Sequence, residues 1–153
     1  MLSKRNGAEI ILNIQYLKDL NFENPQAPSI YGMQNLKPET KVSFDLNAIK
    51  LQNEVFEVEI VINIAVGYGD EEDGANRNNM FSLDAVYAGI FTIRNVSDTE
   101  VQENLFVDCP TLIFPFFRRI VADTTRDANF PPLMLDMIDF EKIYSEKKSN
   151  LKK

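Results

Sequence analysis

Two carboxylates come closest to a catalytic pattern in this sequence. Glu57 and Glu59 lie two positions apart in the run VFEVEIVINIAV (residues 55–66), so on a β-strand their side chains would share one face. Such a pair could divide the roles of general acid and general base. The pattern favours a plainer interpretation, in which both belong to the solvated face of a sheet. The chain also has no histidine, which removes the usual neutral-pH base, the Ser-His-Asp and Cys-His arrangements and most zinc sites.

A second acidic cluster invites a calcium interpretation. Residues 70–73 are four consecutive acids, and Gly74 follows them. In an EF-hand loop with this glycine at the sixth position, Gly69 and Met80 would stand where side-chain oxygen ligands are required. Neither side chain can supply one, so we expect a solvated turn over residues 67–79 and no metal site.

The overall composition limits the partners and the compartment. The chain has 16 Lys and Arg against 23 Asp and Glu, a net charge of −7, which would repel a nucleic-acid backbone and leaves a basic protein as a partner. The single cysteine, Cys109, cannot form an internal disulfide, and this fits a reducing compartment. No run approaches the roughly 20 apolar residues of a membrane-spanning helix, and the N-terminus lacks the apolar core of a signal peptide. We therefore expect a cytoplasmic protein with no cofactor, no nucleic-acid partner and no direct membrane insertion.

Alternating apolar residues predict the strands that must position these groups. Period two recurs in four segments, residues 9–17, 41–47, 55–66 and 81–93. In the first segment this period places Ile10, Leu12, Ile14 and Tyr16 on one face. In the third it places Glu57 and Glu59 opposite an unbroken apolar row, which is typical of a sheet that is buried on one side.

After residue 96 the sequence predicts helices. Ser97 and Glu100 form a capping box, in which each side chain satisfies an amide at the start of a helix. We expect the Cys109-Pro110 step to interrupt this helix, because proline disfavours the helical conformation in the residue before it. Strands followed by helices predict an α+β fold with a four-stranded antiparallel sheet.

The positions of the prolines and of one helix-capping residue predict the remaining C-terminal elements. We expect a helix over residues 111–127 with Pro115 in its first turn or so, where a missing N–H is tolerated. Residues 129–138 should be extended because Pro131 and Pro132 disfavour helix there. Asp139 should cap a last helix that runs from Phe140 to about Lys148.

Apolar residues also occur where a solvated loop is expected. Segment 18–40 contains three prolines together with Phe22, Ile30, Tyr31, Met33 and Leu36. Each of these residues, taken alone, is best interpreted as ordinary core. Taken together with the apolar residues around the last helix, they would form a groove beside a sheet edge, and such a groove suits an unfolded segment better than a rigid ligand.

Local patterns along the chain resemble those of the SecB family of bacterial protein-export chaperones. They are LKDLNFENPQAP (17–28), KPETKVSFDL (37–46), VFEVEIVI (55–62), AGIF (88–91), CPTLIFPFFRR (109–119) and FPPLMLDMIDF (130–140). The resemblance runs from about residue 9 to residue 146. It implies one SecB-like domain over residues 1–153, with strands in 9–96, a long crossover loop in 18–40, helices in 97–148 and a basic tail in 149–153.

The resemblance also implies a function and an assembly. SecB-like chains form a homotetramer, a dimer of dimers with helices between two sheets, and they are not enzymes. They hold precursor proteins unfolded without ATP and pass them to the SecA motor. By position, the peptide-binding residues of the family correspond to Ile30, Tyr31, Leu36, Phe44, Phe140 and Tyr144. The acids that contact SecA correspond to Asp19, Glu23 and Asp84.

The sequence departs from the usual SecB pattern at two places, and two other hypotheses about its function stay open. Leu36 stands where relatives often carry tryptophan, and the basic tail replaces polar or acidic residues that make a second SecA contact. One alternative is a SecB-like chaperone dedicated to an antitoxin, in which the three acids need not bind SecA. Another is a small-ligand-binding or catalytic α+β domain that uses Glu57 and Glu59.

Overall fold

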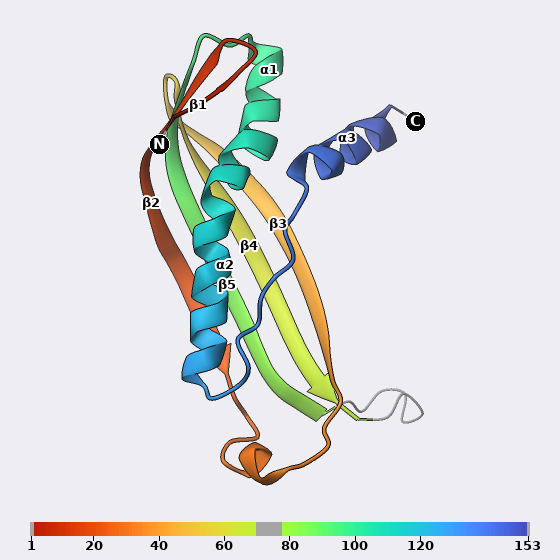
Figure 1. The fold of residues 1–153 in the computed structure, drawn as a ribbon. Helices are drawn as coiled ribbons and strands as arrows, with labels where there is room; N and C mark the ends of the chain where they lie inside the picture. The colour runs from red at the N-terminus through yellow and green to blue at the C-terminus, as the bar shows by residue number, and fades with distance from the viewer. Residues whose placement is uncertain (1, 70–77, 153) are drawn as a thin grey trace.

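The computed structural model describes residues 2–69 and 78–152, and these form an antiparallel sheet followed by helices (Figure 1). The strands are β1 (Leu2–Arg5), β2 (Ala8–Glu23), β3 (Pro38–Gln52), β4 (Val55–Tyr68) and β5 (Asn78–Arg94). The helices are α1 (Asp98–Glu103), α2 (Cys109–Asp127) and α3 (Phe140–Leu151). Asn104–Asp108 form a π-helical turn between α1 and α2, and Ser29–Gly32 form a 3-10 turn.

The predicted α+β architecture is confirmed, and an additional short strand joins the sheet. The strand order is β1-β2-β5-β4-β3, with every neighbouring pair antiparallel. Strand β1 was not predicted from the sequence. Its signal is the Asn6-Gly7 pair, which turns the chain at φ values of 50° and 87° and is the strongest short-range hairpin signal.

The connection between the first two long strands is shorter than predicted. Residues 18–23 extend β2, because their backbone continues to pair with β5 as far as the Glu23–Ser82 position. Pro38 already begins β3, so the connection covers residues 24–37 instead of 18–40. The polar residues that made 18–23 look like a loop lie mostly on exposed positions of the strand. At the other end of the chain, α3 continues to Leu151, so most of the expected tail is helical. The acidic run 70–73 lies outside the described residues.

Helix α2 covers one face of the sheet, here called the inner face, and the opposite side is the outer face (Figure 1). The inner face carries the apolar rows predicted for the last two strands, and these pack against α2. Tyr87 of β5 stacks on Phe117 of α2 with ring centroids 5.6 Å apart. The largest side chains with almost no exposure include Phe91, Phe114, Phe117, Ile60 and Ile62.

A β-bulge corrects one part of the predicted pattern on β2. The register shifts between Leu12 and Ile14, so Leu12 pairs with Phe91 on the inner face whereas Ile14 pairs with Ile90 on the outer face. Tyr16 is carried to the outer face with Ile14, and Ile14 is 57% exposed. The prediction that these two residues share a face with Ile10 and Leu12 is therefore wrong.

The helical region is continuous through the Cys109-Pro110 step, which the sequence analysis expected to interrupt it. The π-helical turn ends there, and the Cys109 N–H donates to the Asn104 carbonyl, five residues back. This wider turn removes the steric conflict that Pro110 would create in a regular α-helix, so the chain continues instead of breaking. Pro115 consequently lies inside α2 rather than in a first turn. No helix in the described ranges is both long and apolar enough to cross a membrane.

The predicted caps are confirmed. Glu100 accepts hydrogen bonds from the Ser97 N–H at 3.1 Å and the Ser97 hydroxyl at 2.8 Å, and these bonds lower the pKa of the Glu100 carboxyl. Asp139 accepts from the Lys142 N–H at 3.0 Å and begins α3.

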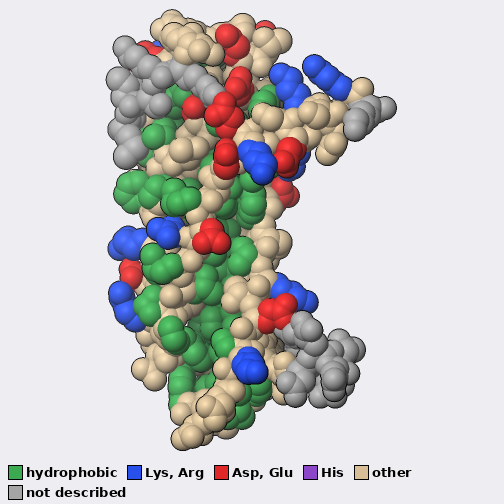
Figure 2. Space-filling model, turned by 45° about the vertical axis from the view of Figure 1, so that its right-hand side comes forward, with side chains coloured by type: hydrophobic (Ala, Val, Ile, Leu, Met, Phe, Trp, Pro, Cys, Tyr) green, Lys and Arg blue, Asp and Glu red, His purple; other side chains and the backbone are tan. Residues whose placement is uncertain are grey.

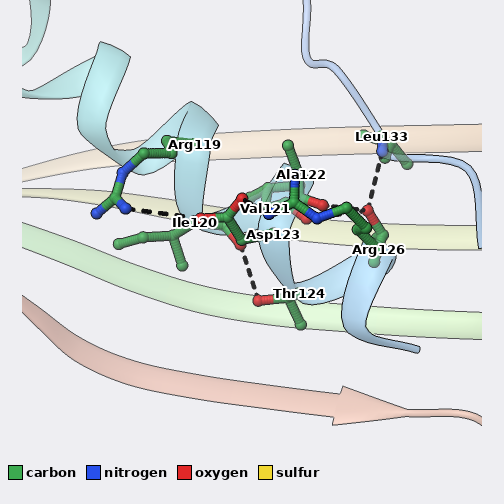
Figure 3. A network of polar contacts seen from close by, with 9 residues as sticks. Arg119, Ile120, Val121, Ala122, Asp123, Thr124, Arg126 and Leu133 are labelled. Carbon is green, nitrogen blue, oxygen red and sulfur yellow. Dashed lines mark hydrogen bonds and ion pairs between the residues drawn. The ribbon is translucent and has the colours of Figure 1, made fainter. Parts of the chain in front are cut away.

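Between α2 and α3 the chain is extended over residues 131–139, here called the strap (Figure 1). The segment predicted to be extended from residue 129 begins two residues later, because residues 128–130 form a turn at the end of α2. The strap runs back alongside α2 and is held by side chains of that helix (Figures 1 and 3). The buried Thr125 hydroxyl accepts a hydrogen bond from the Leu133 N–H at 2.9 Å, and Arg118 donates to the Leu135 carbonyl. Next to this contact, Asp123 pairs with Arg126 at 2.6 Å and with Arg119 at 3.6 Å (Figure 3).

Candidate binding surfaces

The predicted peptide-binding residues fall into two groups at different places on the inner face. The first group lies where the connection 24–37 meets the end of α2, and we call this region the loop end. Ile30 is buried there at 4% exposure, while Tyr31 is 46% exposed. The Tyr31 ring contacts Phe130 at 5.8 Å, and Phe130 contacts Phe81 at 4.8 Å. The loop end is therefore a packed aromatic stack.

Hydrogen bonds fix Tyr31 in this stack. Its hydroxyl donates to the Ala128 carbonyl at 2.6 Å and accepts from Asn24 at 2.7 Å. Leu36 is half-buried and packs against the core on the same connection. These contacts connect the loop to α2. Ile30 and Leu36 pack into or against the core, whereas Tyr31 and Met33 remain 46% and 41% exposed.

The second group lies where α3 meets β3, and we call this region the α3 end. Phe140 is buried at 2% exposure, and its ring contacts Phe44 at 6.2 Å and Phe114 at 5.9 Å, both edge to face. Phe140 is the only buried residue of α3. Tyr144, one turn further along, is half-buried. The helix is thus attached at its first residue and leaves the rest of its apolar side partly uncovered.

A hollow of about 380 Å³ opens beside Tyr144, and we call it the α3 hollow. Its walls come from β3, α1, the π-helical turn and α3. The lining residues are Leu46 of β3, Gln102 of α1, Phe106 of the turn, and Ile143, Tyr144, Lys147, Lys148 and Leu151 of α3. A larger hollow of about 760 Å³ lies next to it and shares Gln102 and Phe106 with it. Both hollows have residues of β3 and α1 in their walls, and Gln102 and Phe106 stand between them.

The structure therefore brings Phe44, Phe140 and Tyr144 together and places Ile30 and Tyr31 elsewhere. Two residues of the α3 hollow were missed although the sequence carried a signal for them. Leu46 lies two positions after Phe44 on the same strand face, and Ile143 belongs to the apolar side of the last helix. Phe106 had no such signal, because its position depends on the π-helical turn.

The outer face carries the predicted carboxylate pair in a network of polar contacts. Lys18 lies between the two acids, at 3.0 Å from Glu57 and in direct contact with Glu59, and Tyr16 donates to Glu57. The bond from Tyr16, followed by that from Lys18, lowers the pKa of the Glu57 carboxyl. Burial and the bond to Glu57 raise the pKa of Tyr16 to about 12. The network thus stabilises the ionised form of Glu57, whereas a general acid needs the protonated form.

The three acids predicted to contact SecA lie together on this face. In the β2–β5 register, Asp19 pairs with Val86, Glu23 pairs with Ser82, and Asp84 pairs with Asn21. Side chains directly opposite one another lie on the same side of an antiparallel pair. Asp84 therefore lies between the levels of Asp19 and Glu23, and it accepts a hydrogen bond from Asn63 at 2.7 Å.

The sheet also has two long edges that carry exposed apolar side chains. On β3, an edge strand of the described sheet, Val42, Ile49 and Leu51 are 48%, 52% and 51% exposed. On β2, residues 8–11 pair with β1, and the strand then continues to Glu23 beyond the end of that pairing. This part of β2 exposes Ile14, Leu17 and Leu20 at 57%, 41% and 39%. Such edges can add a further strand.

Cys109, the first residue of α2, is buried in the interior. It has no solvent exposure, and burial, followed by the neighbouring Asp108 charge, raises the pKa of its thiol well above the usual value. Cys109 therefore packs as a small buried hydrophobe.

Comparisons with known proteins agree with the resemblance to the SecB family that the sequence motifs indicated. The family described as "Preprotein translocase subunit SecB" matches residues 3–151. The "Protein-export protein SecB" of Acidiphilium cryptum is 36% identical over 97% of this chain and 94% of its own length. The protein of the same name from Zymomonas mobilis is 38% identical over 90% of this chain and 79% of its own length.

A solved structure shows a similar fold. It is the SecB-like chaperone of Mycobacterium tuberculosis in complex with a peptide from an antitoxin, and it superposes with a TM-score of 0.61. The match covers 84% of this chain and 90% of the other, at 17% sequence identity. At that identity the likeness concerns the fold alone.

Proposed function

The chain belongs to the SecB family of protein-export chaperones, and from this premise we propose that it holds precursor proteins unfolded in the cytoplasm and delivers them to the SecA motor. The proposal involves no catalytic step and no ATP. The observation that carries it is the α3 hollow, an open and mainly apolar site that Tyr144 lines, while the buried contact between Phe140 and Phe44 attaches α3 next to it.

The client site combines apolar area with free backbone groups. An unfolded client exposes apolar side chains and unpaired backbone amides. The α3 hollow accepts the side chains, and the free edge of β3 beside it offers backbone donors and acceptors to an extended segment. Recognition of this kind depends on area and backbone, so it accepts many sequences.

The assembly we propose is a homotetramer, a dimer of dimers. The free part of β2 supports it, because an unpaired edge with exposed Ile14, Leu17 and Leu20 is a suitable surface for a second copy of the chain. Four copies would place several weak client sites in one particle. The effective concentration of each site for a bound chain would then rise without any tighter individual contact.

The SecA surface we propose is the outer face around Asp19, Glu23 and Asp84. Their shared position supports this, because three acids at consecutive levels of β2 and β5 present one negative surface to a basic partner. The client site lies on the inner face, so a client and SecA could be bound at the same time.

The client site is tested by suppression of aggregation. We expect the purified protein to migrate as a tetramer by native mass measurement and to keep a denatured precursor soluble. Tyr144→Asp places a charge in the α3 hollow and should strongly reduce this holding while the tetramer persists. Ser145→Asp adds the same charge to the same helix at an exposed position outside the hollow and should hold normally. A monomer without holding activity would end the proposal.

The SecA surface is tested by charge reversal. Asp19→Lys and Asp84→Lys should each weaken SecA binding, most clearly at low salt, while client holding survives. Asp127→Lys makes the same change at the exposed end of α2 and should leave SecA binding unchanged. Normal SecA binding by both outer-face variants would show that the three acids were assigned wrongly.

A further inference from the structure

Strand β2 has a second β-bulge, at Lys18, in addition to the bulge nearer its start. Leu17 pairs with Tyr87 of β5. The next pair joins Asp19 to Val86, so Lys18 is an extra residue that has no counterpart on β5. An extra residue of this kind reverses the alternation of side chains beyond it. We call this feature the Lys18 bulge.

The Lys18 bulge decides which face of the sheet carries the acids of the proposed SecA surface. Leu17 lies on the inner face, opposite the β5 tyrosine that stacks on α2. With regular alternation, Asp19 and Glu23 would lie on that face too. Figure 2 shows hydrophobic side chains along much of the helix side of the molecule, where an unpaired carboxylate would be costly. Because the bulge intervenes, both acids lie on the outer face together with Asp84.

A polar network connects the bulge to the far side of β5. The Lys18 ammonium lies 3.0 Å from a carboxylate oxygen of Glu57 and contacts Glu59 directly. Both acids belong to β4, and β5 separates that strand from β2. The β5 residue opposite Glu59 is Ala88, whose small and fully buried side chain leaves room for a longer one to cross the strand. Lys18 therefore connects β2 to a strand that is not its neighbour in the sheet.

The network stays ionised and is partly protected from solvent. The side chains of Glu57 and Glu59 are 12% and 13% exposed, whereas that of Lys18 is 43% exposed. Hydrogen bonds to Glu59 and then to Glu57 raise the pKa of the Lys18 ammonium. Tyr16 donates to Glu57, and this bond, followed by that from Lys18, lowers the pKa of the Glu57 carboxyl. Two largely covered acids hold the lysine more firmly than a fully exposed partner would.

We propose that Lys18 is a positioning residue for SecA binding. Its pairing with Glu57 and Glu59 fixes the Lys18 bulge, and the fixed bulge presents Asp19 to the partner at a constant level beside Asp84. Within the described sheet, β2 pairs at this point with β5 alone, so the network supplies a restraint that backbone pairing lacks. The inference rests on the proposed SecA surface and adds a residue that acts on this surface without touching SecA.

The sign of the effect separates positioning from charge. Lys18→Met removes a positive charge from a face that is proposed to bind a basic partner, so electrostatics alone predict tighter binding of SecA. Positioning predicts the opposite, a loss of about fivefold in affinity, as contacting residues that depend on one another show. Calorimetric titration of the full-length protein with purified SecA measures this change. Lys18→Arg keeps the charge and can reach both carboxylates, so it should restore most of the affinity.

A second lysine on the outer face provides the matched control. Lys41 lines a hollow of about 280 Å³ that Asp84 also lines, and it takes no part in the network. Lys41→Met removes the same charge from the same face and should bind SecA at least as tightly as the wild type. Amide hydrogen exchange at residues 18–20 should accelerate in Lys18→Met and stay unchanged in Lys41→Met. Client holding and urea unfolding confirm that each variant keeps its inner face and its fold.

The outcomes separate this inference from the function on which it rests. If Lys18→Met binds SecA as tightly as Lys41→Met does, the positioning role is wrong while the SecA surface stands. A loss of affinity that Lys18→Arg does not restore also overturns the role, because pairing with the acids is then not the cause. If the wild type does not bind SecA, the proposed SecA surface fails and this inference fails with it.

Discussion

The loop end and the α3 end of the inner face are built from the same kinds of side chain but use them differently. At the loop end, Tyr31 and Phe130 lie 5.8 Å apart, and the Tyr31 hydroxyl bonds to the Ala128 carbonyl at 2.6 Å. At the α3 end, Phe140 packs at 5.9 Å from Phe114, yet Tyr144 lies at the wall of an open hollow of about 380 Å³.

The difference lies in how each segment is attached. The loop is held by ring contacts and hydrogen bonds on both sides of Tyr31, so Tyr31 is fixed in place although its side chain is 46% exposed. Helix α3 has 12 residues but buries only Phe140, so it is held at one end. A helix attached chiefly at its first residue, with Tyr144 only half-buried, keeps part of its apolar side available to a ligand.

Removal of the attachment residue should have the largest effect at the α3 end. Phe140→Ala deletes a ring with 2% exposure and leaves a cavity between Phe44 and Phe114, so we expect a loss of about 3–5 kcal/mol in the free energy of unfolding. Urea denaturation measures this loss, and client binding should fall with it. Tyr144→Ala, at a half-buried position, should reduce client binding at a much smaller cost in stability. Equal stability losses in the two variants would refute attachment through a single residue.

The strap connects the two ends, and its anchor should have an intermediate effect. Thr125→Val keeps the shape of the side chain but leaves the Leu133 N–H without its acceptor, which should cost about 1–3 kcal/mol. Amide hydrogen exchange at Leu133 should accelerate in parallel. Thr124→Val is the matched control, because among the described residues its hydroxyl bonds to the Ile120 carbonyl of its own helix and to no strap residue (Figure 3). Unchanged exchange at Leu133 in the Thr125 variant would mean that Arg118 and packing hold the strap without this bond.

The smallest effect should come from the Tyr31 hydroxyl. Tyr31→Phe keeps the ring contact with Phe130 and removes two hydrogen bonds, so we expect a loss of about 1 kcal/mol in unfolding free energy and unchanged client holding. Tyr144→Phe removes a hydroxyl that makes no hydrogen bond within the described part of the chain and should be neutral in stability. If Tyr144→Phe proved as costly as Tyr31→Phe, the two ends would not differ in the way proposed.

Much of the local structure was predictable because it depends on neighbouring residues. The caps at Ser97 and Asp139 form as predicted, since a cap involves residues within one helical turn. The bulge after Leu12 was not predictable in this way, because it is defined by pairing with β5, a strand that is distant in the sequence. The π-helical turn before Pro110 likewise follows from a balance between the proline and the packing of a continuous helix.

The candidate site was predictable only as a set of residue types. Ile30 and Tyr31 are neighbours in the sequence, yet one is 4% and the other 46% exposed. An apolar side chain is expected to be buried, but its identity does not show which other element of the fold will bury it. The structure therefore leaves Tyr144 at an open hollow and places Ile30 in the core, although the same resemblance selected both.

The sequence by itself determined the two-sided character of the sheet and the net negative charge. Alternation along β4 is a property of successive residues, so Glu57 and Glu59 were assigned to the polar side without knowledge of the fold. Only the tertiary structure decided that Asp19, Glu23 and Asp84 meet on one surface and that two lysines border an apolar hollow in an acidic protein. Both arrangements depend on strand register and on where α3 is attached, and these are fixed by contacts between residues far apart in the chain.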